Sequence, residues 1–262
     1  MMKAIDLNHF LCTLFPALPK PTVDRVTAGD PDRVVKKIAV CWMPFRQAIL
    51  KAKKACANVI VTHEPIFFEH WDLDGESKDH PETASKLRFI EELGITIIRC
   101  HDVWDRMPEI GIPFAWAKFL GLTDLVASNQ FNRVYAIKTQ TALAFARYLG
   151  NRIKNLGQAY VPFYGDPKKR IKTIGIGTGC TDPMNTLALG PDAVVAVDDA
   201  VRSWIAGSFA ESAGTPVYVV NHGVSEEPGM ATLTAFLKKH FPKIPVTHIR
   251  QGCSYRTLWP RG

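Results

Sequence analysis

The stretch NVIVTHEP, residues 58–65, joins a strand pattern to two side chains that can bind a metal ion. Residues 59–62 are all β-branched, which is typical of a short strand. His63 and Glu64 follow at once, where such a strand would end. The stretch therefore predicts a strand that is followed directly by an imidazole and a carboxylate.

Similar apolar, β-branched runs predict further strands at residues 37–43, 96–100, 133–139, 171–177, 193–197, 217–221 and 245–250. Apolar residues at helical spacing fill several of the gaps between these runs. The expected helices run from Phe45 to Cys56, from Pro81 to a stop at Gly94, and along a stripe from Met230 that ends before Pro242. Alternating strands and helices predict an α/β fold with mixed, largely parallel sheets.

Residues 151–170 are rich in Asn, Gly, Pro and Lys and resemble a link between two similar α/β halves, residues 1–150 and 151–262. The first three strands of each half follow the same pattern, and the second and third of them are followed by an acidic residue or His. A duplication would explain this similarity, and so would chance, because short strands resemble one another. We expect ligand-binding residues between the halves, at the C-terminal ends of the strands.

Composition excludes several classes of protein. Of the 262 residues, 47% are hydrophobic, which is ample for a core and excludes wholesale disorder. No apolar run approaches the roughly 18 residues of a membrane span, and the N-terminal stretch is too broken by polar residues for a secretory signal. Six scattered cysteines without a CxxC motif are typical of reduced thiols. We therefore expect a soluble, cytoplasmic protein.

The chain has 32 basic and 25 acidic side chains, which gives a net charge of +7. The basic clusters are short and lack interleaved aromatic residues, so the pattern disfavours direct nucleic-acid binding. An anionic small molecule, such as a nucleotide, is a more fitting partner for this charge. Solvation of helix surfaces is the alternative use of the same side chains.

Three clusters of His and carboxylate residues follow expected strands. In open α/β sheets, ligands bind beyond the carboxyl ends of the strands, so residues distant in the sequence can converge there. Imidazole and carboxylate are ligands for Zn, Mn and Fe, and carboxylates can bridge two ions. The clusters are His63 with Glu64, then His101 with Asp102 and Asp105, and finally His222 with Glu226 and Glu227.

Each member of these clusters also has a structural interpretation. Asp105 can cap a turn, and Glu226 can lie in the first turn of the helix that includes Met230, where a carboxylate is favoured. His101 and Asp105 are four residues apart, as are His222 and Glu226. This spacing fits one face of a helix, and it also fits a tight turn that aims both side chains inwards.

Weaker candidates lie in the second half. The segment GIGTGC, which ends at Cys180, can cradle a phosphate or form a plain tight turn. It lacks a complete dinucleotide or P-loop motif, so the turn is favoured. Cys180 has no motif that marks a nucleophile. Asp198 and Asp199 can approach the site, although capping the helix that follows them is the simpler interpretation.

Together these segments resemble the NIF-three-like proteins, dinuclear-metal-centre hexamers that are also called type 2 homologues of GTP cyclohydrolase I. VIVTHEPIFF, residues 59–68, resembles the family's "tHHPlff" segment, and HDVWD, residues 101–105, stands where the family has a His and an Asp four apart. FLGL at 119–122 matches its "LGL", and NHGVSE at 221–226 is similar to its "GHxxsE". Residues 22–40 more faintly resemble the family's N-terminal "DNvGLqvGd" region.

The resemblance implies a set of site residues and an assembly. Its metal ligands fall on His63, Glu64, Asp105, His222 and Glu226. His101 falls on the motif His beside the metals. The resemblance also implies a toroidal homohexamer whose metal sites face an internal cavity.

Glu64 departs from the family, which has a second His at this position. An oxygen ligand would give the site a harder character and a preference towards Mn, Fe or Mg. The alternatives are one bound ion instead of two, or metal binding without catalysis.

These observations favour a metal-dependent hydrolase with one or two divalent ions, Zn, Mn or Fe. Water activated by metal would attack a polarised carbon or phosphorus centre, as in GTP cyclohydrolase type 2-like chemistry or phosphoester and nucleotide hydrolysis. His101 or Glu64 would move the proton. The alternative is a non-catalytic metal-binding or metal-handling protein, or a regulatory scaffold.

Overall fold

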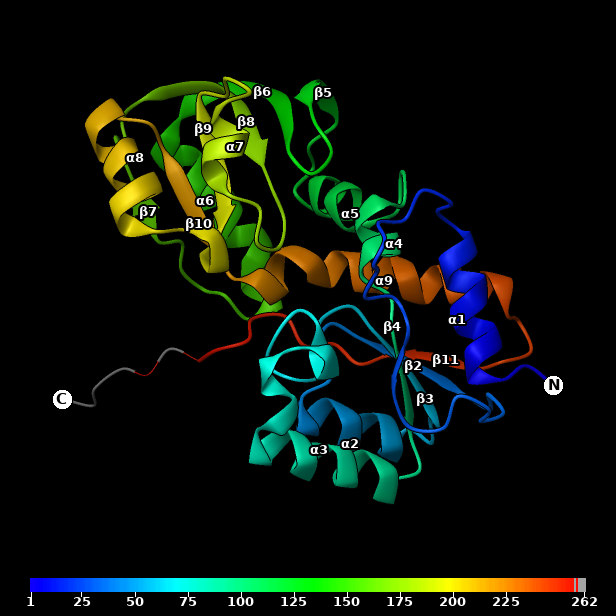
Figure 1. Cartoon of the computed structure of the whole chain (residues 1–262). Helices are drawn as coiled ribbons and strands as arrows, with labels where there is room; N and C mark the ends of the chain where they lie inside the picture. The colour runs from blue at the N-terminus through cyan, green and yellow to red at the C-terminus, as the bar shows by residue number, and fades with distance from the viewer. Residues whose placement is uncertain (257, 259–262) are drawn as a thin grey trace. The chain divides into compact units, whose positions relative to one another are not determined.

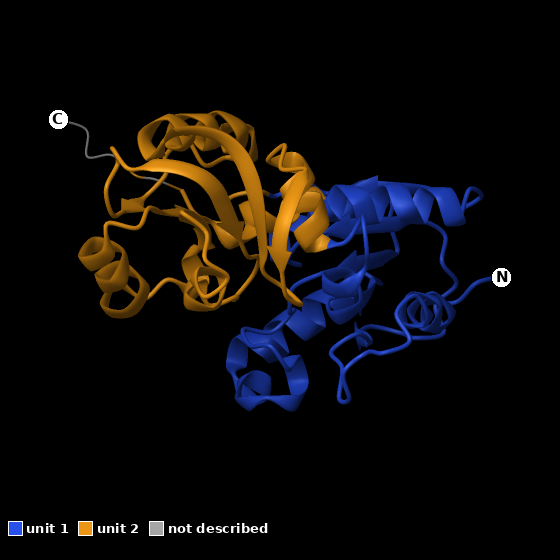
Figure 2. Cartoon of the chain, turned by 90° about the horizontal axis from the view of Figure 1, so that it is seen from above, with its two compact units in different colours: residues 1–111, 229–251 blue, residues 112–228, 252–262 orange. Residues whose placement is uncertain are grey.

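The computed structural model describes residues 1–256 and 258. The chain forms two compact units, each with its own sheet (Figure 2). Unit 1 comprises residues 1–111 and 229–251, and unit 2 comprises residues 112–228 and 252–262. This division differs from the expected halves 1–150 and 151–262, because residues 112–150 supply two strands that extend the sheet of unit 2.

Unit 1 is built on a five-stranded sheet in the order β1-β4-β3-β2-β11 (Figure 1). The four strands β4, β3, β2 and β11 are parallel, and β1 pairs antiparallel with β4. Its elements are α1 (Ala4–Thr13), β1 (Val26–Ala28), β2 (Ile38–Cys41), α2 (Arg46–Lys54), β3 (Val59–Thr62), the 3-10 turns η1 (Asp72–Asp74) and η2 (Glu76–Asp79), α3 (Pro81–Glu92), β4 (Thr96–Arg99), α4 (Asp102–Arg106) and β11 (Val246–His248). The helix α9 (His222–His240) begins in unit 2, and its residues from Gly229 onward belong to unit 1.

Helices α2 and α3 cover one face of the unit 1 sheet. Ile49 and Ile90 from these helices pack in one buried cluster with Ile60 and Ile97 from β3 and β4. The expected apolar face of the first of these helices also included Phe45 and Cys56. Both side chains are exposed, because α2 begins at Arg46 and ends at Lys54 and leaves these two residues outside it.

The opposite face of this sheet is covered by α1 and the later part of α9 (Figure 1). The ring of Phe10 lies 5.0 Å from that of Phe241 and 6.3 Å from that of Phe236. The indole N–H of Trp104 donates to the Gly229 carbonyl at 2.8 Å, so this buried side chain has its polar atom satisfied. These contacts join α1, α4 and α9 into one layer.

Unit 2 contains a six-stranded mixed sheet in the order β5-β6-β8-β9-β10-β7. The strands β8, β9 and β10 are parallel, and the other three are antiparallel to their neighbours. Its elements are α5 (Ile112–Phe119), β5 (Asp124–Ser128), β6 (Arg133–Thr141), α6 (Ala142–Ile153), η3 (Lys154–Leu156), β7 (Phe163–Tyr164), β8 (Arg170–Ile176), α7 (Pro183–Leu187), β9 (Ala193–Val197), η4 (Asp198–Ala200), the π-helical turn η5 (Ser203–Gly207), α8 (Ser208–Ala213) and β10 (Val217–Val220).

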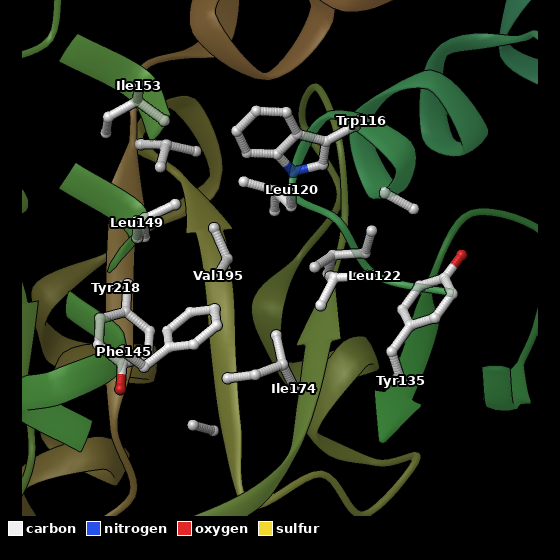
Figure 3. Packing of buried hydrophobic residues seen from close by; sticks show 14 of the residues in the cluster. Trp116, Leu120, Leu122, Tyr135, Phe145, Leu149, Ile153, Ile174, Val195 and Tyr218 are labelled. Atoms are coloured by element: carbon white, nitrogen blue, oxygen red, sulfur yellow. The ribbon is translucent and has the colours of Figure 1, made fainter. Parts of the chain in front are cut away.

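The two faces of this sheet pack against different helices, as the alternation of side chains along β9 requires. Val195 points towards α5 and α6, where it joins Trp116 and Phe145 in the main core of unit 2 (Figure 3). Val194 points to the other face, where it packs with Ala210 of α8. Every residue of β9 is therefore buried, which accounts for its purely apolar sequence.

The predicted α/β fold with mixed, largely parallel sheets is confirmed. All eight expected strands are present, and β9 matches its predicted range. The strands that the sequence did not predict are β1, β5 and β7, which lie at sheet edges and are short or exposed. Within the described part of the chain, no helix combines the length and apolar character needed to cross a bilayer.

Helix α3 carries a buried lysine. Only 6% of Lys86 is exposed, and its ammonium donates to the Ile66 carbonyl at 2.6 Å. The ammonium also lies 5.9 Å from the centre of the Phe67 ring. Burial lowers the pKa of Lys86 to about 8, and the nearby Arg46 charge acts in the same direction.

Because of this lysine, the free energy of unfolding should change with pH in the alkaline range. Above about pH 8 the folded state holds Lys86 neutral, whereas the unfolded chain stays protonated up to about pH 10.5. The free energy of unfolding therefore rises between these values, by up to roughly 3 kcal/mol. Lys86→Met removes this contribution. Denaturant unfolding at pH 7.5 and pH 10 should therefore show that the free energy of unfolding of wild type rises relative to that of the variant at the higher pH. The exposed Lys51→Met is the control, and a pH-independent difference for Lys86→Met would contradict the prediction.

Candidate metal centre

Two histidines meet at the C-terminal edge of the unit 1 sheet. Thr62 and Arg99, the last residues of β3 and β4, are paired in register, so the chain leaves both strands at the same level. The backbone N–H groups of His63 and Glu64 both donate to the Trp42 carbonyl, which turns the chain just after β3. The rings of His63 and His101 then stack, with centroids 4.6 Å apart and planes 15° from parallel.

His63 is fully buried and is oriented by the main chain. Its Nδ1 lies 3.2 Å from the Cys100 carbonyl, which can only accept a hydrogen bond. In the neutral ring the proton is therefore on Nδ1, and Nε2 has the lone pair. That Nε2 lies 3.5 Å from Asp105 Oδ1 and 3.9 Å from Glu64 Oε1. An imidazole held through one nitrogen, with the other beside carboxylates, fits a metal ligand.

His101 lies among the same carboxylates. Its Nε2 is 3.9 Å from Glu64 Oε1, and its Nδ1 is 3.6 Å from Asp105 Oδ2 and 3.5 Å from Asp102 Oδ1. Burial alone would lower the pKa of His101, but Asp105 and Asp102 outweigh it and the pKa is raised. Burial alone would raise the pKa of Asp102, but hydrogen bonds from His101 and Thr22 hold it well below its usual value. The pair favours a protonated imidazole beside an ionised carboxylate.

Asp24 fixes the start of α4 and with it the position of His101. Its carboxylate accepts from the backbone N–H groups of His101, Asp102 and Val103 at 2.7, 2.9 and 2.8 Å. These are donors that a helix N-terminus leaves without partners in the helix itself. The sequence analysis did not select Asp24. Its only signal was the faint family similarity of residues 22–40.

A buried ion pair holds the loop after His63. Arg99 Nε donates to the His63 carbonyl at 3.1 Å, and its guanidinium lies 3.3 Å from Asp72 Oδ2. The other oxygen of Asp72 accepts from the N–H groups of Ile66 and Phe67. The sequence did not predict this pair, because a single Arg at a strand end and a single Asp in a long loop form no recognisable motif.

The unit 2 residues expected at the site are also brought together. His222 is the first residue of α9, and its Nε2 lies 3.1 Å from Glu226 Oε1, one turn later. The spacing of four residues is therefore helical, as it also is for the contact of His101 with Asp105. Glu227 has a different role, because its Oε2 accepts from the Gly252 N–H at 3.0 Å.

Asp198 and Asp199 begin the turn η4, which has no side-chain cap, and both carboxylates contact His222 instead. Asp199 Oδ2 lies 2.8 Å from Nδ1 of His222, and this hydrogen bond lowers the pKa of Asp199. Asp198 accepts from the backbone N–H of His222 and from the side-chain amide of Asn221. The capping role that the sequence favoured is therefore not observed: these residues orient His222 in the way that a carboxylate orients a metal-binding imidazole.

The glycine-rich segment after β8 forms the turn that the sequence favoured. Gly179 has a φ of +58°, which side-chain-bearing residues rarely adopt. A Cβ at this position would lie 3.0 Å from Glu226 Oε1 and 3.4 Å from His222 Nε2. The absence of a side chain therefore lets the main chain pass directly beside these two polar atoms.

Within each unit the structure contains a group of side chains with the spacing of metal ligands. In unit 1, ligand atoms of His63, Glu64 and His101 lie within 4.8 Å of one another. In unit 2 the same holds for Cys180, Asp199 and His222. Ligand atoms that share an ion each lie about 2 Å from it, so any two of them lie within about 4 to 5 Å of each other. The unit 1 donors are buried or half-buried, whereas Cys180 and Asp199 in the unit 2 group are exposed, and both donor sets fit a divalent cation.

The profile of the Duf34/NIF3 family (NGG1p interacting factor 3) matches residues 2–252. The chain belongs to this family. Its fold is similar to that of Staphylococcus aureus protein SA1388, with a TM-score of 0.80 and 18% identity over 98% of this chain and 99% of that one. No curated protein matches the sequence.

Two further solved structures are similar across almost their whole length. Protein ybgI, of unknown function, has a TM-score of 0.80 and 20% identity over 99% of this chain and 100% of that one. Reduced HcgD from Methanocaldococcus jannaschii has a TM-score of 0.73 and 18% identity over 95% of this chain and 98% of that one. At these identities the likeness is one of fold.

We expect Glu64 to influence which metal the unit 1 cluster prefers. Replacing this carboxylate by the softer imidazole, in Glu64→His, should raise affinity for Zn relative to Mn by about an order of magnitude. Competition titrations of the metal-depleted protein with the two ions measure the ratio. Glu92→His, at an exposed position at the end of α3, is the control. An unchanged ratio in Glu64→His would show that Glu64 is not a ligand.

Proposed function

We propose that this NIF3-family chain binds divalent metal through His63, Glu64, Asp105, His222 and Glu226, and hydrolyses an anionic substrate with it. One observation carries the proposal. Each of the two buried imidazoles, His63 and His222, has its Nδ1 beside an oxygen acceptor and its Nε2 within 3.5 Å of a carboxylate oxygen. A buried histidine that served packing alone would not need both nitrogens placed among oxygens.

Hydrolysis is the reaction that this donor set supports best. When bound, a divalent cation would supply Lewis acidity, which activates water and polarises the bond to be cleaved. Zn, Mn and Fe are the candidates, because the ligands combine imidazole with carboxylate.

The chain's own residues provide for the proton. Asp105 and Asp102 raise the pKa of His101, which favours a protonated imidazole that could give its proton to a leaving group. Glu64 Oε1 lies 3.9 Å from His101 Nε2 and can take up a proton or pass it to that nitrogen. Asp102, hydrogen-bonded to Thr22, keeps the imidazole oriented. His101 and Glu64 are therefore the proposed catalytic pair.

The substrate class follows from charge. An excess of seven basic side chains favours an anionic small molecule, and a nucleotide or another phosphate ester suits a metal-dependent hydrolase. GTP cyclohydrolase type 2-like ring opening and phosphoester hydrolysis are the two reactions to test first. Metal bound without turnover would instead support a metal-handling or regulatory protein.

The experiment combines metal analysis with a substrate panel. The full chain, loaded in turn with Mn, Fe, Zn and Mg, is assayed on nucleotides and phosphoesters. His101→Gln should lower kcat by about 10²- to 10⁴-fold while metal stays bound, because it removes the proposed proton donor and leaves intact the five proposed ligands, which do not include His101. His63→Ala and His222→Ala should each lower metal affinity by more than the roughly 10- to 100-fold typical of an outer-shell partner.

The exposed His9→Ala is the matched control and should alter neither quantity. Full metal content in His63→Ala and His222→Ala would overturn the ligand assignment. Tight metal binding with no turnover on the whole panel would overturn the hydrolase assignment alone.

We also propose that the chain assembles into a homo-oligomeric ring of six subunits, as its family resemblance implies. Large apolar side chains exposed on single units, including Phe68, Trp71 and Trp204, are suited to subunit contacts. Light scattering at micromolar concentration should give a mass of about 175 kDa, six times the 29.2 kDa of one chain. A 29.2 kDa species under these conditions would contradict the assembly.

A further inference from the structure

Unit 2 places a thiol beside its metal-binding histidine. A ligand atom of each of Cys180, Asp199 and His222 lies within 4.8 Å of the other two. The three residues follow β8, β9 and β10, which are adjacent parallel strands. The sheet itself therefore brings together three donors from separate parts of the sequence.

The backbone at Gly179 explains how the thiol comes so close. Its left-handed φ of +58° and the short distances from its Cβ position to Glu226 and His222 require glycine at this point. Thr181 closes the turn, since both its N–H and its hydroxyl donate to the Thr178 carbonyl, at 3.2 and 2.7 Å. The turn is held by these hydrogen bonds and has glycine at residue 179, so the next residue, Cys180, lies close to the imidazole of His222.

The donors differ in their roles. Asp199 is hydrogen-bonded to Nδ1 of His222 and so orients the ring from behind. His222 Nε2 and Glu226 Oε1, 3.1 Å apart, are the pair proposed to face the metal. Cys180 is exposed, and its sulfur lies within 4.8 Å of a ring nitrogen of His222, so it can reach an ion bound to that ring and can also exchange with solvent.

We propose that Cys180 is a thiolate ligand of the metal held by His222. The inference rests on the proposed metal binding and adds a ligand to it. When the sulfur–metal bond forms, the thiol S–H bond breaks and one proton goes to solvent, with no change in oxidation state. A thiolate is a soft donor, so it shifts the unit 2 ligand set towards Zn or Fe and away from Mg and Mn.

Cobalt(II) tests this directly, because its spectrum reports ligand type without any assay of activity. The full-length, metal-depleted chain is titrated with Co(II). Visible ligand-field bands show that the metal is bound, whereas a sulfur-to-cobalt charge-transfer band in the near ultraviolet requires a thiolate ligand. Wild type should show both features. Cys180→Ser should keep the visible bands and lose the near-ultraviolet band.

Cys56→Ser is the matched control, since Cys56 is the other exposed cysteine among the described residues and lies in unit 1. This variant should keep both features. In a second measurement, Zn should slow the alkylation of Cys180 by iodoacetamide and leave that of Cys56 unchanged, as peptide mass spectrometry would show.

The outcomes separate the two proposals. Absence of all cobalt bands would overturn the proposed metal function itself. Visible bands without a thiolate band, or a thiolate band that survives in Cys180→Ser, would overturn the role of Cys180 while metal binding stands. Equal alkylation of Cys180 with and without Zn would also overturn it, because the thiol would then be uncoordinated.

Discussion

Parallel strand pairing in register is the constraint on which both clusters depend. In unit 1, Thr62 pairs with Arg99, so the residues that follow β3 and β4 emerge level with each other. In unit 2, Val197 pairs with Val220, which brings Asp198 and Asp199 to His222. Each residue of a strand rises about 3.3 Å, so a slip of two residues would separate these partners by more than a hydrogen-bond length.

Burying so many ionisable groups costs stability unless each is bonded to a partner. Fixed donors offset much of this cost. Asp24 accepts from three backbone N–H groups and Asp72 from two, and the guanidinium of Arg99 donates to the His63 carbonyl. These bonds orient the site and also reduce the penalty of desolvation. Within unit 1, the carboxylates of Glu64 and Asp105 beside His63 repel each other, and within unit 2 those of Asp199 and Glu226 do so beside His222. A divalent cation would offset the repulsion in either cluster.

The sequence predicted which His and carboxylate side chains lie near the ends of strands; their role as a site stays a prediction. His63, Glu64, His101, Asp105, His222 and Glu226 were selected because they come just after β-branched runs, and a buried parallel strand has a strong local signature. The strand β9 was predicted to the residue for the same reason.

What the sequence did not reveal depends on contacts between distant residues. Asp24 supports a helix that begins at residue 102, and Asp72 pairs with Arg99. A single Asp in a loop resembles any solvated turn acid, so neither contact has a local pattern. The division into units was also hidden, because the later part of α9 and β11 return to the sheet of unit 1 after the whole of unit 2 has been traversed.

His63 and His222 donate from Nδ1 to different kinds of acceptor. This difference should make their Nε2 atoms unequal in basicity, and so unequal as ligands. His63 donates from Nδ1 to a neutral carbonyl, that of Cys100, whereas His222 shares its Nδ1 proton with the carboxylate of Asp199. An anionic acceptor makes the opposite nitrogen more basic, so Nε2 of His222 is the stronger donor of the two. The stronger imidazole also has the thiol of Cys180 nearby, whereas the weaker one stands with Glu64 and Asp105. If the proposed metal binding holds, one chain has a softer and a harder ligand set, each at the C-terminal ends of parallel strands. The acceptors that orient the histidines would then affect metal preference together with the ligands themselves.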